Sequence, residues 1–459
     1  MSNNEIFKLI AAAQHRLDEG FSDLPPVSEA PLDDQVANIL NEAATRLHDN
    51  YPYAHPLYAG QMLKPPHPIA RAAYMLAMSI NPNNHALDGG RASSAMELEA
   101  VAVLAKMFGF PQHLGHLSSS GTFANLEALW VSGQLSPGRG IAASDQAHYT
   151  HTRISSVLCL PFVEIPSDAT GRMDLAALER ALVDHNIGTV VATLGTTAVG
   201  AVDPLDEILK LQQKYHFRIH VDSAYGGYFT LASNLAPAAR AAYDSIPQAD
   251  SIVVDPHKHG LQPYGCGAVL FRDPSVGRLY KHDSPFTYFS SKELHLGEIS
   301  LECSRAGASA VALWSTQRLL PYTPGGAFAQ GLESGREAAL EFNRRLSQSP
   351  HFVTPMAPPQ LDIVFWAAKS TTAAASSALA QRIFDEAARF DLHLALASLP
   401  VRYFPSHAWP QDEQNKSVTC LRSVLMKPEH LAWLDQIWQR LESATHQAAL
   451  SIPQQNHRE

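Results

Sequence analysis

The chain has 459 residues, of which 46% are hydrophobic and 17% charged, the balance of a globular protein with a large core. Its formal net charge of −10 lacks the basic excess of nucleic-acid-binding proteins, and no run approaches the ~18 consecutive apolar residues of a membrane span. We therefore expect neither nucleic acid nor membrane as a partner. Four cysteines far apart in the sequence predict no disulfide framework, and no signal peptide is recognisable, so the cytoplasm is the expected compartment.

The N-terminal part is predicted to form two amphipathic helices joined by a proline-rich link. Neither helix can bury its apolar face alone, so both are expected to dock elsewhere. Polar loops rich in glycine and proline then alternate with two further helices. The predicted helices are 5–19, 34–48, 68–80 and 97–108, and the loops are 52–62 and 81–90.

A serine- and glycine-rich run, Ser118-Ser-Ser120-Gly121-Thr122, opens the next helix. Free backbone N–H groups, hydroxyls and the positive end of the helix dipole together suit a phosphate. Taken alone, the run is equally typical of a simple helix N-cap.

From here short apolar runs alternate with helical patterns. Nearly continuous apolar strands separated by helices predict a mostly parallel sheet covered on both faces, the organisation of an α/β protein. The predicted strands are 140–143, 158–165, 189–194, 217–221 and 265–271, and the helices are 148–157, 174–184, 204–215 and 306–320. Beyond the hinge at 321–326, alternating helices and strands predict a smaller α+β domain.

Two strands in this region end in residues of opposite charge. Asp222 ends the run from Ile219, and Lys258 follows the run from Ala249. Ligands in open α/β sheets sit beyond the carboxyl ends of strands. A lysine that bonds to an aldehyde and a carboxylate that keeps a ring nitrogen protonated predict a pyridoxal phosphate site. Such a lysine must be desolvated or flanked by positive charge to react. Either residue alone would be interpreted as a surface side chain.

The segments His220-Val-Asp-Ser-Ala-Tyr-Gly-Gly227 and Asp255-Pro-His-Lys258 resemble the signature of the group II pyridoxal-phosphate amino-acid decarboxylases. The resemblance covers roughly residues 52 to 428. It implies the aspartate-aminotransferase fold (fold type I), with a mostly parallel seven-stranded-type sheet. It also implies a homodimer with active sites at the subunit interface, across which the N-terminal helices pack.

The resemblance also implies roles for individual residues. Lys258 would carry the cofactor, Asp222 would hold its ring nitrogen protonated, and His148 would stack on its ring and serve as a proton donor. The other implied cofactor contacts are Ser120, Gly121, Thr122, Ser251 and His257 at the phosphate, Thr197 near the ring oxygen and Ala224 on the ring face opposite His148. One departure is Phe123, where the family often has glutamate.

Further positions are implied on the substrate side. Tyr58 and Gln61 lie in a segment that touches substrate in the family, although a plain linker is an equal alternative. His85 and Leu87 would enter the neighbouring subunit's site. Tyr288, in the polar, aromatic segment 280–291, would protonate the carbanion that decarboxylation leaves. His148 and His151 are spaced as metal ligands on a helix, but no third ligand is implied nearby, so no metal is expected and His151 and His220 are interpreted as structural.

We therefore predict a helical arm and dimerisation segment (1–64), a large pyridoxal-phosphate-binding domain (65–322) and a small C-terminal domain (323–459). The predicted function is decarboxylation of an L-amino acid to its amine and carbon dioxide. The alternatives are an aldehyde-forming decarboxylase–oxidase, an aminotransferase or a carbon–carbon lyase with the same site, and a binding protein that has kept only the fold. The pattern does not identify the substrate, since an aromatic, imidazole or acidic side chain fits it.

Overall fold

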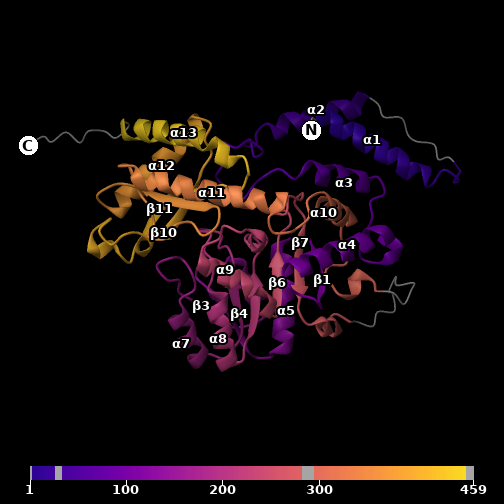
Figure 1. The fold of residues 1–459 in the computed structure, drawn as a ribbon, viewed down its shortest axis with the longest axis horizontal. Helices are drawn as coiled ribbons and strands as arrows, with labels where there is room; N and C mark the ends of the chain where they lie inside the picture. Colours follow the sequence, from indigo (N-terminus) through magenta and orange to yellow (C-terminus); the bar gives the residue numbers. More distant parts are fainter. Residues whose placement is uncertain (1–2, 26–33, 282–293, 451–459) are drawn as a thin grey trace, which may run out of the picture.

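A computed structural model of the chain describes residues 3–25, 34–281 and 294–450. Two sheets organise these residues, each with helices packed on it (Figure 1). The strands are β1 (Leu114–Ser118), β2 (Gly140–Ser144), β3 (Phe162–Ile165), β4 (Ile187–Thr193), β5 (Arg218–Asp222), β6 (Ser251–Val254), β7 (Gly267–Phe271), β8 (Phe352–Val353), β9 (Ile363–Ala368), β10 (Ala395–Pro400) and β11 (Ser417–Val424).

The helices follow the predicted order except for α9, which is not predicted, and the other differences lie mainly at helix ends. They are α1 (Asn3–Glu19), α2 (Asp34–Leu47), α3 (Pro68–Met78), α4 (Leu87–Met107), α5 (Gly121–Leu135), α6 (Thr150–Val157), α7 (Leu175–Asp184), α8 (Leu205–Tyr215), α9 (Pro237–Asp244), α10 (Gly307–Leu319), α11 (Ala327–Gln348), α12 (Ala373–Arg389) and α13 (His430–Leu450). None of them, within the residues the structure describes, has the length and apolar character needed to cross a bilayer.

The larger sheet has seven strands in the order β1-β7-β6-β5-β4-β2-β3. β7 pairs antiparallel with both of its neighbours, and the strands from β6 to β3 pair in parallel. All residues of β2, β4, β6 and β7 are buried, as continuous apolar strands between two helical layers require. The predicted fold class is thus confirmed. Parallel pairing brings the carboxyl ends of β4, β5 and β6 to one edge of the sheet.

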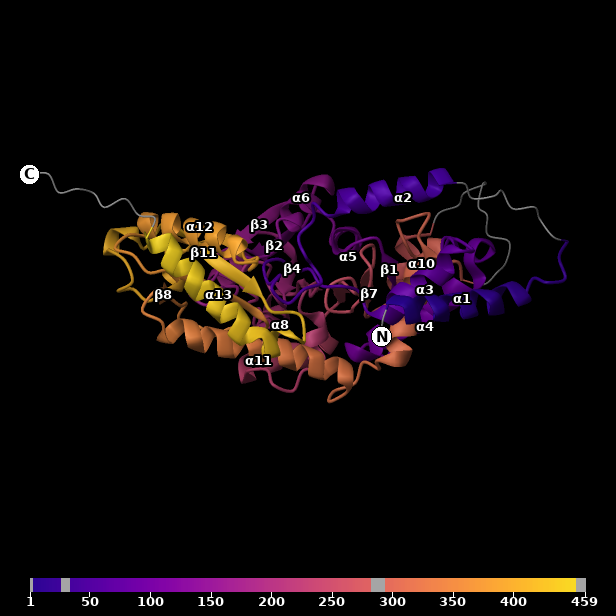
Figure 2. The same cartoon turned by 90° about the horizontal axis from the view of Figure 1, so that it is seen from above.

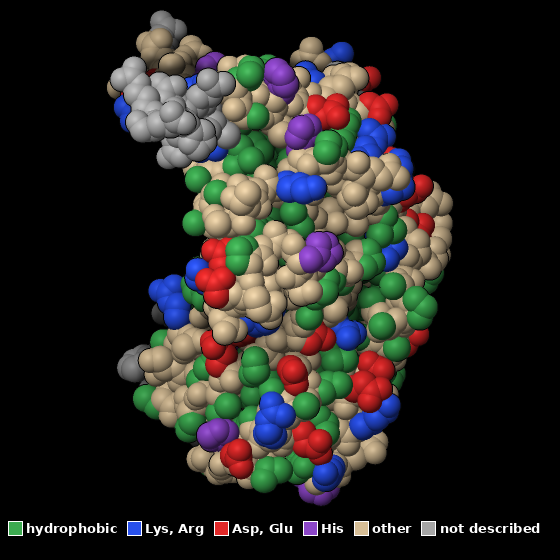
Figure 3. Space-filling view, turned by 90° about the vertical axis from the view of Figure 1, so that its left-hand side faces the viewer, with side chains coloured by type: hydrophobic (Ala, Val, Ile, Leu, Met, Phe, Trp, Pro, Cys, Tyr) green, Lys and Arg blue, Asp and Glu red, His purple; other side chains and the backbone are tan. Residues whose placement is uncertain are grey.

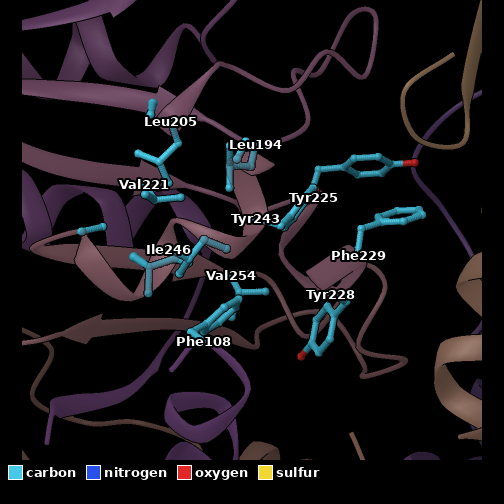
Figure 4. Close-up of a cluster of buried hydrophobic side chains, with 14 of the residues drawn as sticks. Phe108, Leu194, Leu205, Val221, Tyr225, Tyr228, Phe229, Tyr243, Ile246 and Val254 are labelled. Carbon is cyan, nitrogen blue, oxygen red and sulfur yellow. The ribbon is translucent and has the colours of Figure 1, made fainter. Parts of the chain in front are cut away.

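The main core lies between this sheet and its helices. Phe108, which follows α4, lies beside Val254 of β6, and Val221 of β5 lies beside Leu205 of α8, as Figure 4 shows. Tyr225 and Tyr243 lie close to Leu194 in the same cluster (Figure 4). Fully burying one such side chain contributes about 1.5–3 kcal/mol, so the core holds the strand ends beneath the candidate site rigidly in place.

The smaller sheet is antiparallel, in the order β10-β11-β9-β8, and α11, α12 and α13 lie around it (Figure 2). Its core centres on Trp366, whose ring meets that of Phe342 edge-on at a centroid distance of 5.3 Å. Leu57 and Ala59 belong to this core as well, because the Ala59 N–H donates to the His393 carbonyl. The end of the predicted arm therefore packs within the small sheet's layer. The division into three domains remains a prediction.

The loop predicted over 81–90 is shorter in the structure. α4 begins at Leu87 and kinks at Gly90, where φ is −169° and ψ is 63°. A buried ion pair anchors the preceding turn, with Arg305 Nη1 at 2.5 Å from Glu97 Oε1 and Glu97 Oε2 accepting from Asn84. Burying this pair is tolerable because each member has hydrogen-bonding partners.

The N-terminal helices differ in how they are covered. α1 packs against α3, whereas α2 leaves Val36, Ile39, Leu40 and Leu47 exposed. On the face of the molecule shown in Figure 3, charges of both signs are interspersed.

Candidate active site

A cavity of about 190 Å³ lies at the carboxyl ends of β4, β5 and β6. Its walls come from the residues after these strands, from the start of α5 and from the segment leading into α6. The lining residues are Ser120, Gly121, Thr122, Asn125, His148, Thr150, Thr193, Gly195, Thr197, Asp222, Ala224, Tyr225, Asp255, His257 and Lys258. The structure thus brings the predicted carboxylate and lysine to the same cavity, as the strand-end argument requires.

Asp222 is buried and held ionised by its neighbours. Its Oδ2 lies 2.7 Å from Nε2 of His151, and its Oδ1 accepts the backbone N–H of Ala224 at 3.1 Å. Burial by itself would raise the pKa of Asp222, but the hydrogen bond and charge of His151 outweigh burial and hold the pKa below its ordinary value. Asp222 is therefore an anion placed to pair with a protonated group in the cavity.

A second histidine supports this arrangement from behind. Nε2 of His220 lies 2.8 Å from the Asn125 side-chain oxygen, and Nδ1 lies 2.9 Å from the Ser251 hydroxyl. Burial lowers the pKa of His220 to about 3, so the ring is neutral. Because an amide oxygen only accepts, Nε2 carries the proton and Nδ1 accepts from Ser251. This network fixes Asn125, whose amide nitrogen lies 3.5 Å from Asp222 Oδ2.

Lys258 does not have the positive surroundings expected for a reactive lysine. Its Nζ lies 2.9 Å from Oδ2 of Asp255. Burial would lower the pKa of Lys258, but the charge of Asp255 and its hydrogen bond outweigh burial and raise the pKa above its ordinary value. The lysine is thus an ammonium ion whose partner is the aspartate three residues earlier in the chain.

The start of α5 provides a set of N–H donors. The Ser120 hydroxyl accepts from Phe123 N at 3.3 Å, so the serine does cap the helix. Among the described residues, the N–H groups of Gly121 and Thr122 have no acceptor, and both residues line the cavity. A Cβ at Gly121 would lie 2.6 Å from both oxygens of Asp255, so only glycine fits there. Ser120 therefore caps the helix while the N–H groups of Gly121 and Thr122 remain available to bind an anion.

His148 forms another wall of the cavity. Its Nδ1 lies 2.8 Å from the Thr150 hydroxyl, which orients the ring. Burial lowers the pKa of His148, and the charge of Asp222 opposes this only in part. The imidazole is therefore neutral near pH 7, with a geometry that lets it accept and donate a proton.

These groups fit pyridoxal phosphate. A helix start can bind the phosphate, a lysine can bond to the aldehyde, and an ionised carboxylate can pair with the ring nitrogen. Two buried atoms at the cavity, Oδ1 of Asp255 and Nδ1 of His257, have no hydrogen-bond partner among the described residues. A ligand in the cavity could supply the hydrogen-bond partners that these two atoms lack.

Residues 127–368 match the sequence profile of the pyridoxal-dependent decarboxylase conserved domain, more than half of the chain. The chain belongs to the pyridoxal-dependent decarboxylase family. It is thus an amino-acid decarboxylase that uses pyridoxal phosphate, as its sequence motifs predicted.

The chain is similar to two decarboxylases in sequence and to one solved structure in fold. The L-tyrosine decarboxylase of Enterococcus faecium is 27% identical, over 89% of each chain. The probable L-tyrosine/L-aspartate decarboxylase of Methanocella arvoryzae is 30% identical, over 63% of this chain and 73% of its own. The crystal structure of Oryza sativa TDC with PLP and tryptamine superposes with a TM-score of 0.77 over 97% of this chain and 96% of that chain. At 17% identity this last likeness shows the shared fold alone.

Not every predicted site residue lines the cavity of the decarboxylase. Ser251 is buried behind it, bonded to His220. The proposed substrate contacts Tyr58, Gln61, His85 and Leu87 are also absent from the lining within the single chain. Gln61 accepts from Arg422 at 3.4 Å, and the Leu87 N–H donates to His295 at 3.0 Å. The part that His85 and Leu87 play in a neighbouring subunit stays a prediction, and Tyr288 lies outside the described residues.

Sequence reasoning missed three functional neighbours. His151 holds Asp222, Asp255 pairs with Lys258, and Asn125 bridges Asp222 to His220. A buried carboxylate needs a partner, and His151 lies three residues from His148, about one helical turn away. The spacing of the two histidines also resembles that of metal ligands. The need of a buried Asp222 for a hydrogen-bond donor is the signal that points to His151 as its partner.

Proposed function

We propose that this decarboxylase acts on an aromatic L-amino acid, with L-tyrosine as the first candidate, and releases the corresponding amine. The observation that carries this proposal is a broad, mostly apolar cavity of about 680 Å³ that adjoins the cofactor site through Tyr264. Tyr53, Pro56, Leu63 and Tyr264 are among its lining residues. Aromatic and proline walls favour an aromatic side chain over a charged one.

Tyr264 connects this apolar cavity to the cofactor site. Its ring lies 4.8 Å from the ring of His257, and its hydroxyl donates to the Met62 carbonyl at 3.3 Å. Burial raises the pKa of Tyr264, and the charge of Lys258 opposes that rise. A substrate whose amine reaches Lys258 would therefore place its side chain beside Tyr264. The relative named L-tyrosine decarboxylase supports the same choice, and the relative named for both L-tyrosine and L-aspartate makes L-aspartate the competitor to test.

Each polar residue of the cofactor cavity has a defined task in this proposal. When bound, pyridoxal phosphate would supply an electron sink for the substrate Cα. Asp222, held ionised by His151, would keep the ring nitrogen protonated. Lys258 would hold the cofactor, and Asp255 would pair with the ammonium group of the lysine when that group is free. His148 supports the ring and can move a proton at the reacting carbon.

The site also favours loss of the carboxylate over other reactions. Among the described lining residues of the cofactor cavity, Lys258 is the one lysine or arginine. A substrate carboxylate there would meet no arginine among the described lining residues that could stabilise it as an anion in the ground state. Protonation of Cα, assigned to Tyr288 or His148, would then end the reaction as an amine.

We further propose that the enzyme works as a homodimer in the cytoplasm. The exposed apolar residues of α2, Ile39 (57% exposed) and Leu40 (64%) among them, suit burial against a second copy. His85 and Leu87 would then reach the partner's site. Free thiols at Cys266 and Cys420, both buried, suit a reducing compartment.

The test is amine and carbon dioxide release from L-tyrosine, L-phenylalanine, L-tryptophan, L-aspartate and L-glutamate by the purified enzyme with pyridoxal phosphate. We expect kcat/KM for an aromatic substrate to exceed that for L-aspartate at least about 100-fold, the effect of ~2.7 kcal/mol of differential binding. A preference for L-aspartate would refute the substrate proposal. Hydrogen peroxide and ammonia in place of amine would indicate the aldehyde-forming reaction. Activity that survives Lys258→Ala would refute the lysine assignment.

A further inference from the structure

A second cavity, of about 270 Å³, lies behind Lys258. It shares no lining residue with the cofactor cavity, and it adjoins the 680 Å³ cavity proposed for the substrate side chain, with which it shares Ala54, Lys64, Pro65 and Pro66. Its walls come from the segment before α3, the residues after Lys258, the start of α11 and the residues after β11. Most of the wall is apolar, with Pro65, Leu261, Phe328 and Leu332 among its members. Its volume is just below the range of pockets for drug-sized ligands, so it suits a smaller molecule.

Two lysines place their ammonium groups in this mostly apolar wall, which also includes His67, His259 and Glu429. Lys427 is only 3% exposed, and its Nζ donates to the Tyr58 carbonyl at 2.6 Å. Nζ of Lys64 donates to the Met426 carbonyl at 3.1 Å. Within the described residues, neither lysine forms an ion pair with a carboxylate. An ammonium group has three donors, so each lysine retains donors that these contacts do not use.

The acidic groups nearby form no ion pair with the two lysines among the described residues. Burial lowers the pKa of Lys64 and of Lys427 to about 8, and the charges of the nearby carboxylates oppose this only in part. Asp362 accepts from His259 at 2.8 Å and from the Tyr225 hydroxyl, so its oxygens already have partners. Glu429 is exposed at the rim of the cavity and makes no ion pair among the described residues. Burying two like charges together without an anion is costly, and buried lysines are normally paired.

The second cavity also shares a hydrogen-bonded wall with the active site. His259, the residue after Lys258, lines it, and Nδ1 of His259 lies 3.0 Å from the Tyr225 carbonyl. Tyr225 in turn lines the cofactor cavity. A ligand in the second cavity would therefore lie one layer of side chains away from the reactive lysine.

We propose that this cavity is a second binding site, for a small carboxylic acid with an apolar body of arylacetate size. The carboxylate would lie between the ammonium groups of Lys64 and Lys427, and the apolar body would lie against Leu261, Phe328 and Leu332. Binding would supply the missing anion and remove apolar surface from water in one step.

The experiment is a calorimetric titration of the holoenzyme with phenylacetate, repeated with neutral phenylacetamide and with inorganic phosphate. Phenylacetate is expected to bind with a Kd at least tenfold lower than that of either other probe. Lys427→Met and Lys64→Met should each weaken phenylacetate binding at least tenfold. Lys369→Met, a substitution of an exposed lysine on the small sheet's side, is the matched control and should leave the Kd unchanged.

A steric variant covers the case in which the buried lysine variants fail to fold. Ala327 lines the cavity but is exposed, so Ala327→Phe should fill the entrance while leaving both lysines in place. It too should abolish phenylacetate binding. Equal binding of phenylacetamide, or unchanged phenylacetate affinity in Ala327→Phe, would overturn the proposal. So would the absence of saturable binding, or displacement of phenylacetate by an amino-acid substrate, which would place the acid in the active site.

Discussion

The hydrogen bond from His151 to Asp222 can be tested by replacing His151 with phenylalanine. Phenylalanine keeps the aromatic shape but cannot donate to the carboxylate at 2.7 Å. A hydrogen bond to a charged group contributes about 1.5–3 kcal/mol, so its loss should weaken pyridoxal phosphate binding about 10- to 100-fold. The weakening follows because Asp222 without its donor pairs less well with the protonated ring nitrogen.

The effect of pH on the cofactor Kd tests the same role of His151. The depressed pKa of Asp222 contributes stability above the pKa of an unfolded aspartate, about 3.9, and this contribution is lost as the pH falls towards the folded pKa. In His151→Phe, burial dominates and the folded pKa rises. The variant's Kd for the cofactor, relative to that of the wild type, should therefore grow as the pH is lowered from about 8 to about 5.

The assay is equilibrium titration of apoenzyme with the cofactor, followed by protein fluorescence. His185→Phe, at an exposed position after α7, is the matched control and should bind the cofactor as the wild type does. If His151→Phe binds the cofactor within twofold of the wild type at every pH, the role assigned to His151 is wrong.

Three further variants test the site. Asp255→Asn removes the carboxylate that raises the pKa of Lys258, so the pH profile of cofactor incorporation into apoenzyme should shift to lower pH; an unshifted profile would contradict the pairing. Gly121→Ala places a Cβ 2.6 Å from the Asp255 oxygens, and the cofactor's Kd should rise at least about tenfold, a cost of ~1.4 kcal/mol, in the same fluorescence titration. Arg422→Met removes the donor to the carbonyls of Thr197, Ala198 and the buried Gly60, and urea unfolding should show a loss of about 2–4 kcal/mol; wild-type stability would refute this bracing role.

Local sequence patterns predict much of the fold and the two central residues of the site, Asp222 and Lys258. Asp222 and Lys258 could be placed at strand ends because a short apolar run that stops at polar residues is a local pattern. The helices and most strands of the large sheet followed from the same periodicity. The sequence pattern predicts neither β1 nor α9, and it predicts a loop where the structure has the kinked start of α4. There a tertiary anchor, the Glu97–Arg305 ion pair, holds the turn before the helix.

The partners of the charged residues were decided only in three dimensions. His151 was assigned a structural role because nothing in its neighbourhood in the sequence shows that α6 brings it within 2.7 Å of a carboxylate on β5. Ser251 was placed at the phosphate, but alternation along β6 turns its hydroxyl to His220 behind the cavity.

The sequence by itself determined that this chain is a pyridoxal-phosphate enzyme. Asp222 and Lys258 each lie within a continuous run of residues that is specific to such enzymes. The tertiary structure alone decided which groups hold those two residues ionised, and that Lys64 and Lys427 meet at one cavity although they are far apart in the chain. The physical reason is that charge pairing and burial depend on strand order and domain packing. The spacing of neighbouring residues in the sequence determines neither the charge pairing nor the burial.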